Sequence, residues 1–300
     1  MLLSYLKQLQ ASGQTHLPVT QEAREVLRQL YKGELSLAPG QAPAPQKKGS
    51  VEAVEEAAQT PRATIPRPAA SPTSPSSTRQ QLSGIPSING QTKEEQLTSL
   101  QTQAKNWPAI KTLGSLRPTM VFSSGNPEAD VMLIGDAPGH HEERARAPFQ
   151  GPTGEKLDAI LKAMGLSREA VYLSNLCKFR PALPGQTTNN RRPRPEEMEA
   201  CLPFVMAEIK IVQPKVIVAL GASAAQNLLA SEEPFDNLRG QWHEIAGTPV
   251  RVSHHPSFLL LSNQDALAEK RKIWEEMLVV MEKLALPITD KQRSYFLPKK

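Results

Sequence analysis

The sequence predicts an α/β fold in which helices cover both faces of a parallel sheet. Four short, largely apolar runs with the length of buried strands alternate with segments whose apolar residues recur at helical spacing. Strands and helices that alternate in this way form parallel sheets with both faces covered. Polar side chains follow several of the apolar runs, and ligands of such sheets lie beyond the carboxyl ends of the strands.

The expected elements begin with a helix at 94–107, after which strands and helices alternate. The strands are expected at 130–135, at 170–179, at 215–221 and within 248–257. The other helices are expected at 151–166, 194–214, 222–230 and 265–284. Gly165 is a typical helix stop, and Pro195 is typical of a first helical turn.

The chain outside residues 94–290 is expected to be organised differently. Residues 1–36 have the apolar spacing of two short amphipathic helices, which form either a small docking module or marginal helices that fray. Residues 37–93 are rich in Pro, Ala, Ser and Gln, and we expect a disordered linker because so few large apolar side chains cannot offset the chain entropy. Residues 291–300 are interpreted as a C-terminal tail.

Composition limits the class of protein. The formal net charge of +5 permits nucleic-acid binding without requiring it. The two cysteines, Cys177 and Cys201, form no CxxC pair, so the sequence predicts neither a zinc site nor a disulfide framework. Such cysteine usage suits a reducing cytoplasm, and neither a signal peptide nor a membrane-spanning apolar run is visible. We therefore expect a cytoplasmic protein without a membrane partner.

Polar residues at the ends of three expected strands predict a catalytic site. Asp136 follows the first strand, Asn175 lies near the end of the second, and His255 follows the fourth. An Asp in such a place is usually a turn former or helix cap, and an isolated histidine is usually structural. Their coincidence at successive strand ends favours an active site.

The stretch GDAPGHHEE at 135–143 admits three interpretations: a turn with a solvated acidic rim, a metal site, or a catalytic loop. His140 and His141 are adjacent and lack the i, i+4 spacing of a helical metal pair. No strand is followed by GxGxxG, which argues against a dinucleotide redox enzyme, and no GxSxG elbow marks a serine nucleophile. The catalytic loop is therefore favoured.

Six blocks of the sequence resemble the uracil-DNA glycosylase superfamily, nearest to its family 4. In chain order they are GNPEADVMLIGDAPG, APFQGPTGEKLD, YLSNLCKFRP, EACLPFVMAEIKIVQPKVIVALGASAAQNLL, LRGQW and HHPSFLL. The resemblance covers about residues 119–284. It implies a three-layer α/β/α sandwich with a short central parallel four-stranded sheet. It also implies hydrolysis of the N-glycosidic bond of flipped-out uracil in DNA, as in base excision repair, leaving an abasic site without a cofactor in the chemistry.

The resemblance assigns the chemistry to two residues. His255 corresponds to the family histidine that donates a hydrogen bond toward uracil O2 as negative charge develops there. Asp136 stands where family 4 usually has Glu, and its carboxylate would stabilise the sugar cation and hold the attacking water. Its side chain is one methylene shorter, so its reach is open. Backbone N–H groups of the loop around Ala137 are expected to add to the stabilisation of the anion.

The resemblance also places a uracil pocket. Phe149 corresponds to the stacking aromatic, and the Asn175 amide would accept from uracil N3–H while donating to O4, a pattern that cytosine reverses. Glu142 corresponds to a position near uracil C5 that helps exclude thymine, although a solvated rim carboxylate is an equal alternative. Gly135 and Ala137 complete the pocket.

DNA contacts are expected from two segments. Ser257, Phe258, Leu259 and Leu260 form a candidate wedge loop, with packing under the C-terminal helix as an equal alternative. Arg191 and Arg192 lie in an Arg-rich loop that would contact phosphates or simply be solvated.

The sequence departs from family 4 in the residues that hold its usual iron–sulfur cluster. The early CxxC pair is missing, the KCRP block reads KFRP with Phe179, and only Cys201 remains in a ligand position. A typical cluster needs four ligands, normally thiolates, so we predict no cluster and no other cofactor. Packing that includes Trp107 and Phe179 would have to replace it.

Two alternatives to a uracil-DNA glycosylase stay open from the sequence. One is a degenerate family member that binds DNA or a repair partner without cleaving, and the other is a small-nucleotide hydrolase on the same fold. We expect a monomer, with residues 1–36 as a possible tether for a repair protein.

Overall fold

The computed structural model describes residues 84–260 and 266–297. The predicted helices of 1–36, residues 37–83 of the predicted linker and the last three residues of the predicted tail lie outside the described residues. Described residues of the predicted linker contact the first helix, because Gln103 Nε2 donates to the carbonyl oxygen of Ser87.

A six-stranded sheet lies at the centre of the described residues, in the order β2-β4-β3-β6-β8-β7. Its strands are β2 (Ser123–Gly125), β4 (Tyr172–Asn175), β3 (Val131–Gly135), β6 (Val216–Leu220), β8 (Thr248–Ser253) and β7 (Trp242–Ile245). The inner four strands are parallel, which confirms the predicted four-stranded parallel sheet. The two edge strands, β2 and β7, are antiparallel additions that the sequence analysis did not predict.

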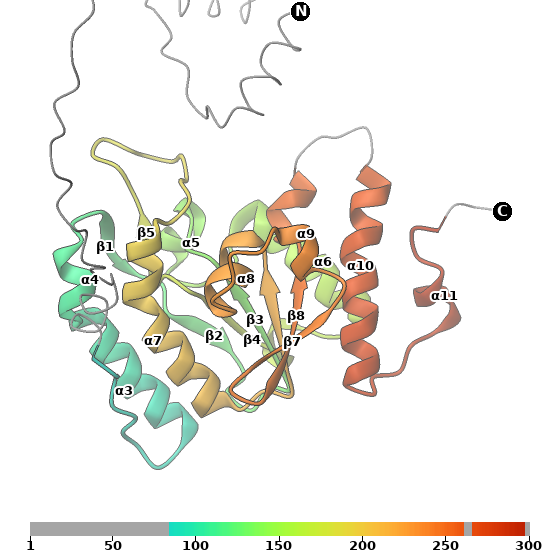
Figure 1. Cartoon of the computed structure of the whole chain (residues 1–300), viewed down its shortest axis with the longest axis horizontal. Coiled ribbons are helices and arrows are strands. Elements are labelled where there is room, and N and C mark those ends of the chain that lie inside the picture. Colours follow the sequence, from blue (N-terminus) through green and yellow to red (C-terminus); the bar gives the residue numbers. More distant parts are fainter. Residues whose placement is uncertain (1–83, 261–265, 298–300) are drawn as a thin grey trace, which may run out of the picture. The chain divides into compact units, whose positions relative to one another are not determined.

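Helices cover both faces of this sheet because successive side chains of a strand point to opposite faces (Figure 1). In β3, Val131 and Leu133 belong to one apolar core, while Met132 and Ile134 belong to another. The first core includes residues of α6 (Gly151–Met164) and α10 (Ala266–Lys283). The second includes residues of α3 (Lys93–Asn106), α7 (Pro195–Val212) and α8 (Ala222–Leu228). These layers confirm the predicted α/β/α sandwich.

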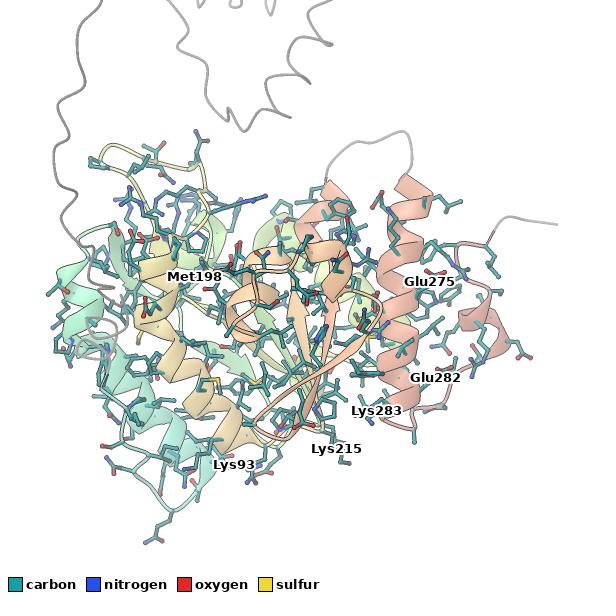
Figure 2. All side chains as sticks on the ribbon, viewed as in Figure 1. Lys93, Met198, Lys215, Glu275, Glu282 and Lys283 are labelled. Carbon is teal, nitrogen blue, oxygen red and sulfur yellow. The ribbon has the colours of Figure 1, made fainter. Side chains whose placement is uncertain are left out.

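The helices begin and end at the residues that their chemistry favours. Thr92 caps α3 by accepting from the backbone N–H of Glu95, and α6 ends at Gly165 in the left-handed conformation. Figure 2 shows charged side chains such as Glu275 and Glu282 along α10, and both are about half exposed. The opposite face of α10 buries Trp274 and its apolar neighbours, so packing stabilises this helix.

The predicted strand at 170–179 is wrong in its length. Residues 172–175 form β4, and the chain then turns before β5 (Phe179–Pro181), which pairs antiparallel with β1 (Leu116–Met120) in a separate two-stranded sheet. The apolar run is interrupted at Lys178, whose ammonium group is buried and paired with Glu208 at 2.5 Å. This pair fixes the segment after β4 against α7.

Several short elements complete the described fold. They are α4 (Pro108–Thr112), α5 (His140–Ala145), α9 (Phe235–Leu238), α11 (Asp290–Arg293) and the 3-10 turns η1 (Arg168–Ala170) and η2 (Pro256–Leu260). Helix α11 lies largely in the predicted C-terminal tail, and it is held to the domain because Gln292 Nε2 donates to the Ala163 carbonyl at 2.8 Å. No helix of the described residues is long and apolar enough to cross a membrane.

Candidate active site

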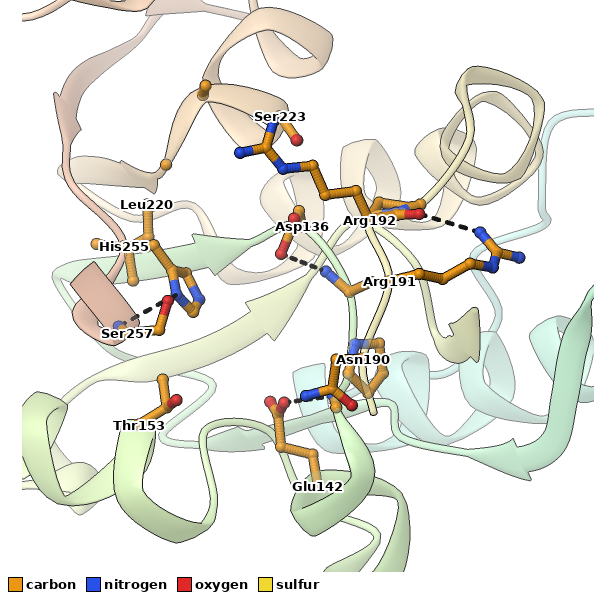
Figure 3. Close-up of a pocket in the computed structure, with 16 residues that line it drawn as sticks. Asp136, Glu142, Thr153, Asn190, Arg191, Arg192, Leu220, Ser223, His255 and Ser257 are labelled. Atoms are coloured by element: carbon orange, nitrogen blue, oxygen red, sulfur yellow. Dashed lines mark hydrogen bonds between the residues drawn. The ribbon is translucent and has the colours of Figure 1, made fainter. Parts of the chain in front are cut away.

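A pocket of about 330 Å³ lies at the carboxyl ends of the parallel strands. Asp136 follows β3 and His255 follows β8, and both line the pocket together with Glu142 of α5 (Figure 3). The other lining residues are Ala137, Pro138, Gly139, Thr153, Asn190, Arg191, Arg192, Pro193, Leu220, Gly221, Ala222, Ser223 and Ser257. The position matches the general rule for ligands of open α/β sheets.

The hydrogen bonds of His255 define its tautomer. Its Nδ1 accepts from the backbone N–H of Ser257 at 3.3 Å and lies 2.8 Å from the Ser257 hydroxyl. A nitrogen that accepts from a backbone N–H carries no proton, so the proton of the neutral ring is on Nε2. Burial lowers the pKa of His255, with the charge of Asp136 acting in the opposite sense. His255 is therefore a neutral imidazole with one N–H donor.

Backbone N–H groups of two other residues hold Asp136 at the pocket. Its carboxylate accepts from the N–H of Ala137 at 2.9 Å, and its carbonyl accepts from the N–H of Cys177 at 2.9 Å. The Gly139 N–H donates to Glu142, and Pro138 has no N–H. The Ala137 and Gly139 N–H groups thus donate to side chains of the protein itself, and the expected contribution of the loop N–H groups to anion binding stays a prediction.

Glu142 is a wall of the pocket and has three partners within the protein. One oxygen accepts from the Gly139 N–H at 2.6 Å, and the other accepts from the Phe149 N–H at 2.6 Å and from Asn175 Nδ2 at 3.3 Å. Burial is the main reason that its pKa lies above the ordinary value. The residues expected to be a loop form helix α5, which directs Glu142 inward.

Gly135, Phe149 and Asn175 lie next to this pocket without lining it. Phe149 and Asn175 are each 1% exposed, and the Phe149 ring is 5.9 Å from the His255 ring at an angle of 31°. A Cβ on Gly135 would lie 2.3 Å from Asn175 Oδ1 and 3.1 Å from Phe149 Cζ. Glycine is required at the end of β3, because these two side chains close in on the strand.

The candidate wedge residues have different environments. Phe258 stacks on His254 with ring centroids 4.2 Å apart and packs against the apolar core, as does Leu259. Leu260 is 43% exposed at the end of η2. Burial between aromatic neighbours lowers the pKa of His254 to about 4. Phe258 and Leu259 are half-buried, so Leu260 is the exposed member of the three apolar candidates.

The two candidate arginines also differ. Arg191 pairs with Glu197, a buried carboxylate, and donates to the Ser115 carbonyl at 3.0 Å. Arg192 is exposed, and its side chain extends over the pocket toward Ser223 (Figure 3). The structure thus holds Arg191 within the loop and leaves Arg192 facing the pocket.

Sequence reasoning missed residues that shape the pocket wall. Asn190 accepts from the His140 N–H at 3.0 Å, and its amide lies against Gly139, where a Cβ would come within 2.6 Å. Arg180 is buried and donates to Glu143 at 2.9 Å and to the Thr187 and Asn189 carbonyls. Arg180 therefore ties α5 to the loop that carries Asn190. The only sequence signal for Asn190 was its place in the Arg- and Asn-rich loop.

The cysteines do not fit the iron–sulfur cluster that the resemblance to family 4 implies. The chain has two, and both are buried. A hydrogen bond between the two thiols raises the pKa of Cys177 and lowers that of Cys201. Both pack in one apolar core with Phe179 and Trp107. In the described part of the chain, no three His, Cys, Asp or Glu side chains are grouped to hold a metal ion.

Comparisons with known proteins agree with the architecture and the resemblance. The family model of the Uracil DNA glycosylase superfamily matches residues 122–278. The Type-4 uracil-DNA glycosylase of Thermotoga maritima is 34% identical over 180 residues, which cover 59% of this chain and 89% of that protein. The Type-4 uracil-DNA glycosylase of Archaeoglobus fulgidus is 36% identical over 148 residues, which cover 47% of this chain and 71% of that protein.

A more distant relative belongs to another type. The Type-5 uracil-DNA glycosylase of Thermus thermophilus is 30% identical over 183 residues, covering 54% of this chain and 78% of that protein. The matched family model spans the six strands of the central sheet and the residues that line the pocket. The chain therefore belongs to the uracil DNA glycosylase superfamily.

Proposed function

We propose that this protein is a uracil-DNA glycosylase that hydrolyses the N-glycosidic bond of uracil flipped out of DNA and leaves an abasic site. The observation that carries the proposal is that Asp136 and a neutral His255 line one pocket from different strands. The family relationship to Type-4 and Type-5 uracil-DNA glycosylases supports the same substrate.

His255 stabilises the leaving group. Breaking the bond leaves negative charge on the uracil ring, and a fixed N–H donor stabilises that charge most where water is excluded. The contact of Nδ1 with the Ser257 N–H leaves Nε2–H as the donor of the ring. A neutral donor suits the task because it needs no proton from solvent before the base departs.

Asp136 acts on the sugar side of the bond. The departing base leaves an electron-poor sugar, and a carboxylate nearby stabilises this cation and orients the water that attacks it. One oxygen of Asp136 is fixed by the Ala137 N–H, so the carboxylate is held in one orientation.

Base recognition and DNA contact complete the proposed site. Phe149 provides the stacking surface, Asn175 reads the uracil edge, and Gly135 and Ala137 shape the approach to it. Leu260 enters the gap that the flipped base leaves, while Phe258 and Leu259 support it from the core. Ser257 and Arg192 lie at the pocket and contact the DNA backbone, and Arg191 supports the Arg192 loop.

The proposal requires no cofactor, and no step passes through an iron–sulfur cluster. Two thiols are too few for the four ligands that such a cluster normally takes. We further propose that 94–290 is the catalytic domain, that 37–93 is a linker and that 1–36 tethers a repair partner of a monomeric, cytoplasmic enzyme. The tail at 291–300 takes no part in the chemistry.

Identification of the products tests this function. The full chain is incubated with a duplex carrying one uracil, and both free uracil and alkali-labile abasic sites are measured. The proposal expects both products in equal amounts. Tight binding without either product would instead indicate a DNA-binding protein of the same fold. Release of uracil from nucleosides but not from DNA would indicate a small-nucleotide hydrolase.

A further inference from the structure

We propose that Glu142 sets the preference for uracil over cytosine by fixing which end of the Asn175 amide faces the base. This role goes beyond filling space near uracil C5, and it rests on the proposed function. Glu142 is thus a positioning residue, because it acts on the base through Asn175.

The contact between the two side chains has a fixed polarity. Glu142 accepts from Asn175 Nδ2 at 3.3 Å, and its two oxygens also accept from the backbone N–H groups of Phe149 and Gly139. An ionised carboxylate only accepts hydrogen bonds, so the amide must turn its NH₂ group toward Glu142. The amide oxygen is then directed elsewhere, and a rotation by half a turn would place two acceptors against each other.

The amide oxygen of Asn175 lies against the backbone at the end of β3. Asn175 Oδ1 lies so close to Gly135 that a Cβ there would come within 2.3 Å of it. Among the described residues no donor is hydrogen-bonded to Oδ1, so its lone pairs remain for a ligand. Asn175 is 1% exposed, which leaves the amide little freedom to reorient by itself.

The fixed polarity matches uracil. Uracil presents a donor at N3–H and an acceptor at O4, whereas cytosine presents an acceptor at N3 and a donor at N4. An amide with its oxygen toward N3 and its second N–H toward O4 pairs with uracil at both positions. The rotated amide would pair with cytosine, so the orientation of one side chain decides between the bases.

The same carboxylate also holds the stacking ring. The oxygen of Glu142 that faces Asn175 accepts from the Phe149 N–H at 2.6 Å, and Phe149 has the left-handed φ of 53° that few non-glycine residues adopt. Loss of the carboxylate therefore affects uracil binding through Phe149 and through Asn175. Only the effect through Asn175 changes the ratio between the two bases, because stacking does not distinguish pyrimidines by their hydrogen bonds.

The test uses Glu142→Gln, which keeps the shape of the side chain but adds a donor. Single-turnover excision is measured on single strands that carry uracil or cytosine at the same position. We expect the rate of uracil excision to fall at least about tenfold, as for loss of a charged hydrogen bond. We also expect the ratio of the uracil rate to the cytosine rate to fall about tenfold relative to the wild-type ratio. Glu94→Gln, the same change at an exposed residue of α3, should keep both rates.

A double-mutant cycle separates positioning from general support of the fold. In an Asn175→Ala background, Glu142→Gln should leave the ratio of the two rates unchanged, because the group through which it acts is gone. Thermal unfolding identifies variants that do not fold. Two rates that fall together in Glu142→Gln, or a cytosine rate that stays undetectable, overturn the inference. A wild-type chain that releases no uracil overturns the proposed function instead.

Discussion

The backbone N–H of Ser257 donates to Nδ1 of His255 at 3.3 Å, and this contact places the single proton of the neutral imidazole on Nε2. The tautomer is therefore built into the η2 turn and does not depend on the substrate. A backbone donor cannot be lost by side-chain rotation, so the assignment holds for Ser257→Ala as well.

The first prediction concerns the protonation of His255. Because burial lowers its pKa below 6.5, the ring should stay neutral with Nε2 protonated as the pH falls from 8 to 6.5. Nitrogen-15 NMR of the histidine side chains reports both the tautomer of the His255 ring and the midpoint of its titration. A depressed folded-state pKa means that the unfolded chain binds the proton first, so this group costs stability as the pH falls below 6.5. A midpoint at or above 6.5 would contradict the assignment.

The second prediction concerns Gly135. Alanine there would place a methyl group 2.3 Å from Asn175 Oδ1 and displace the reading amide. Because displacements of about 1 Å at a reacting site cost about a hundredfold in rate, kcat/KM for uracil excision should fall by that factor. Gly165→Ala is the control. The added methyl group would strain the left-handed backbone of Gly165, but no atom beyond its two chain neighbours lies within 4 Å of it. A Gly135→Ala enzyme as active as the control would show that the close approach is unimportant.

The third prediction separates the two arginines. Arg192→Ala should reduce the slope of log K against log salt for duplex binding by about 0.9, as expected for one lost phosphate contact. Arg191→Ala should instead lower the free energy of unfolding by roughly 1–3 kcal/mol, because the buried carboxylate of Glu197 loses its partner. Salt titration of DNA binding measures the first effect, and denaturant unfolding measures the second. A smaller salt slope in Arg191→Ala together with a loss of stability in Arg192→Ala would refute the two assignments.

The fourth prediction concerns the wedge. Leu260→Ala should slow excision from duplex DNA by about tenfold, since opening the stack costs a few kcal/mol, and should leave excision from single strands unchanged. Leu259→Ala should lower the thermal unfolding temperature because Leu259 packs on the core. If Leu260→Ala slowed excision equally from duplex DNA and from single strands, Leu260 would not be a wedge.

The sequence predicted the parallel strands and the main helices because their signals are local. The run at 215–221 is apolar throughout, and β6 occupies Val216–Leu220 with every residue buried. The end of β4 was predicted less well, because the apolar pattern continues into Leu176 and Cys177 while the chain turns there. Lys178 gave no local sign that its charge would be buried against Glu208.

Site residues were predictable where they follow a strand, and their neighbours were not. Asp136 and His255 stand at strand ends, which the alternation of elements locates without a structure. The inward direction of Glu142 depends on the turn of α5 and on Asn175, which is 33 residues away in the chain. The pairing of Arg191 with Glu197 likewise appears only when the loop is folded onto α7.

The most direct test of the central claim is the single-turnover rate of uracil excision by Asp136→Asn and His255→Gln. Both substitutions keep the size of the side chain, and Asp290→Asn on the exposed helix α11 is the control. We predict losses of at least about a hundredfold for both variants, with retained DNA binding and an unchanged rate for the control. Wild-type rates in either variant would contradict the claim that these two residues carry the chemistry.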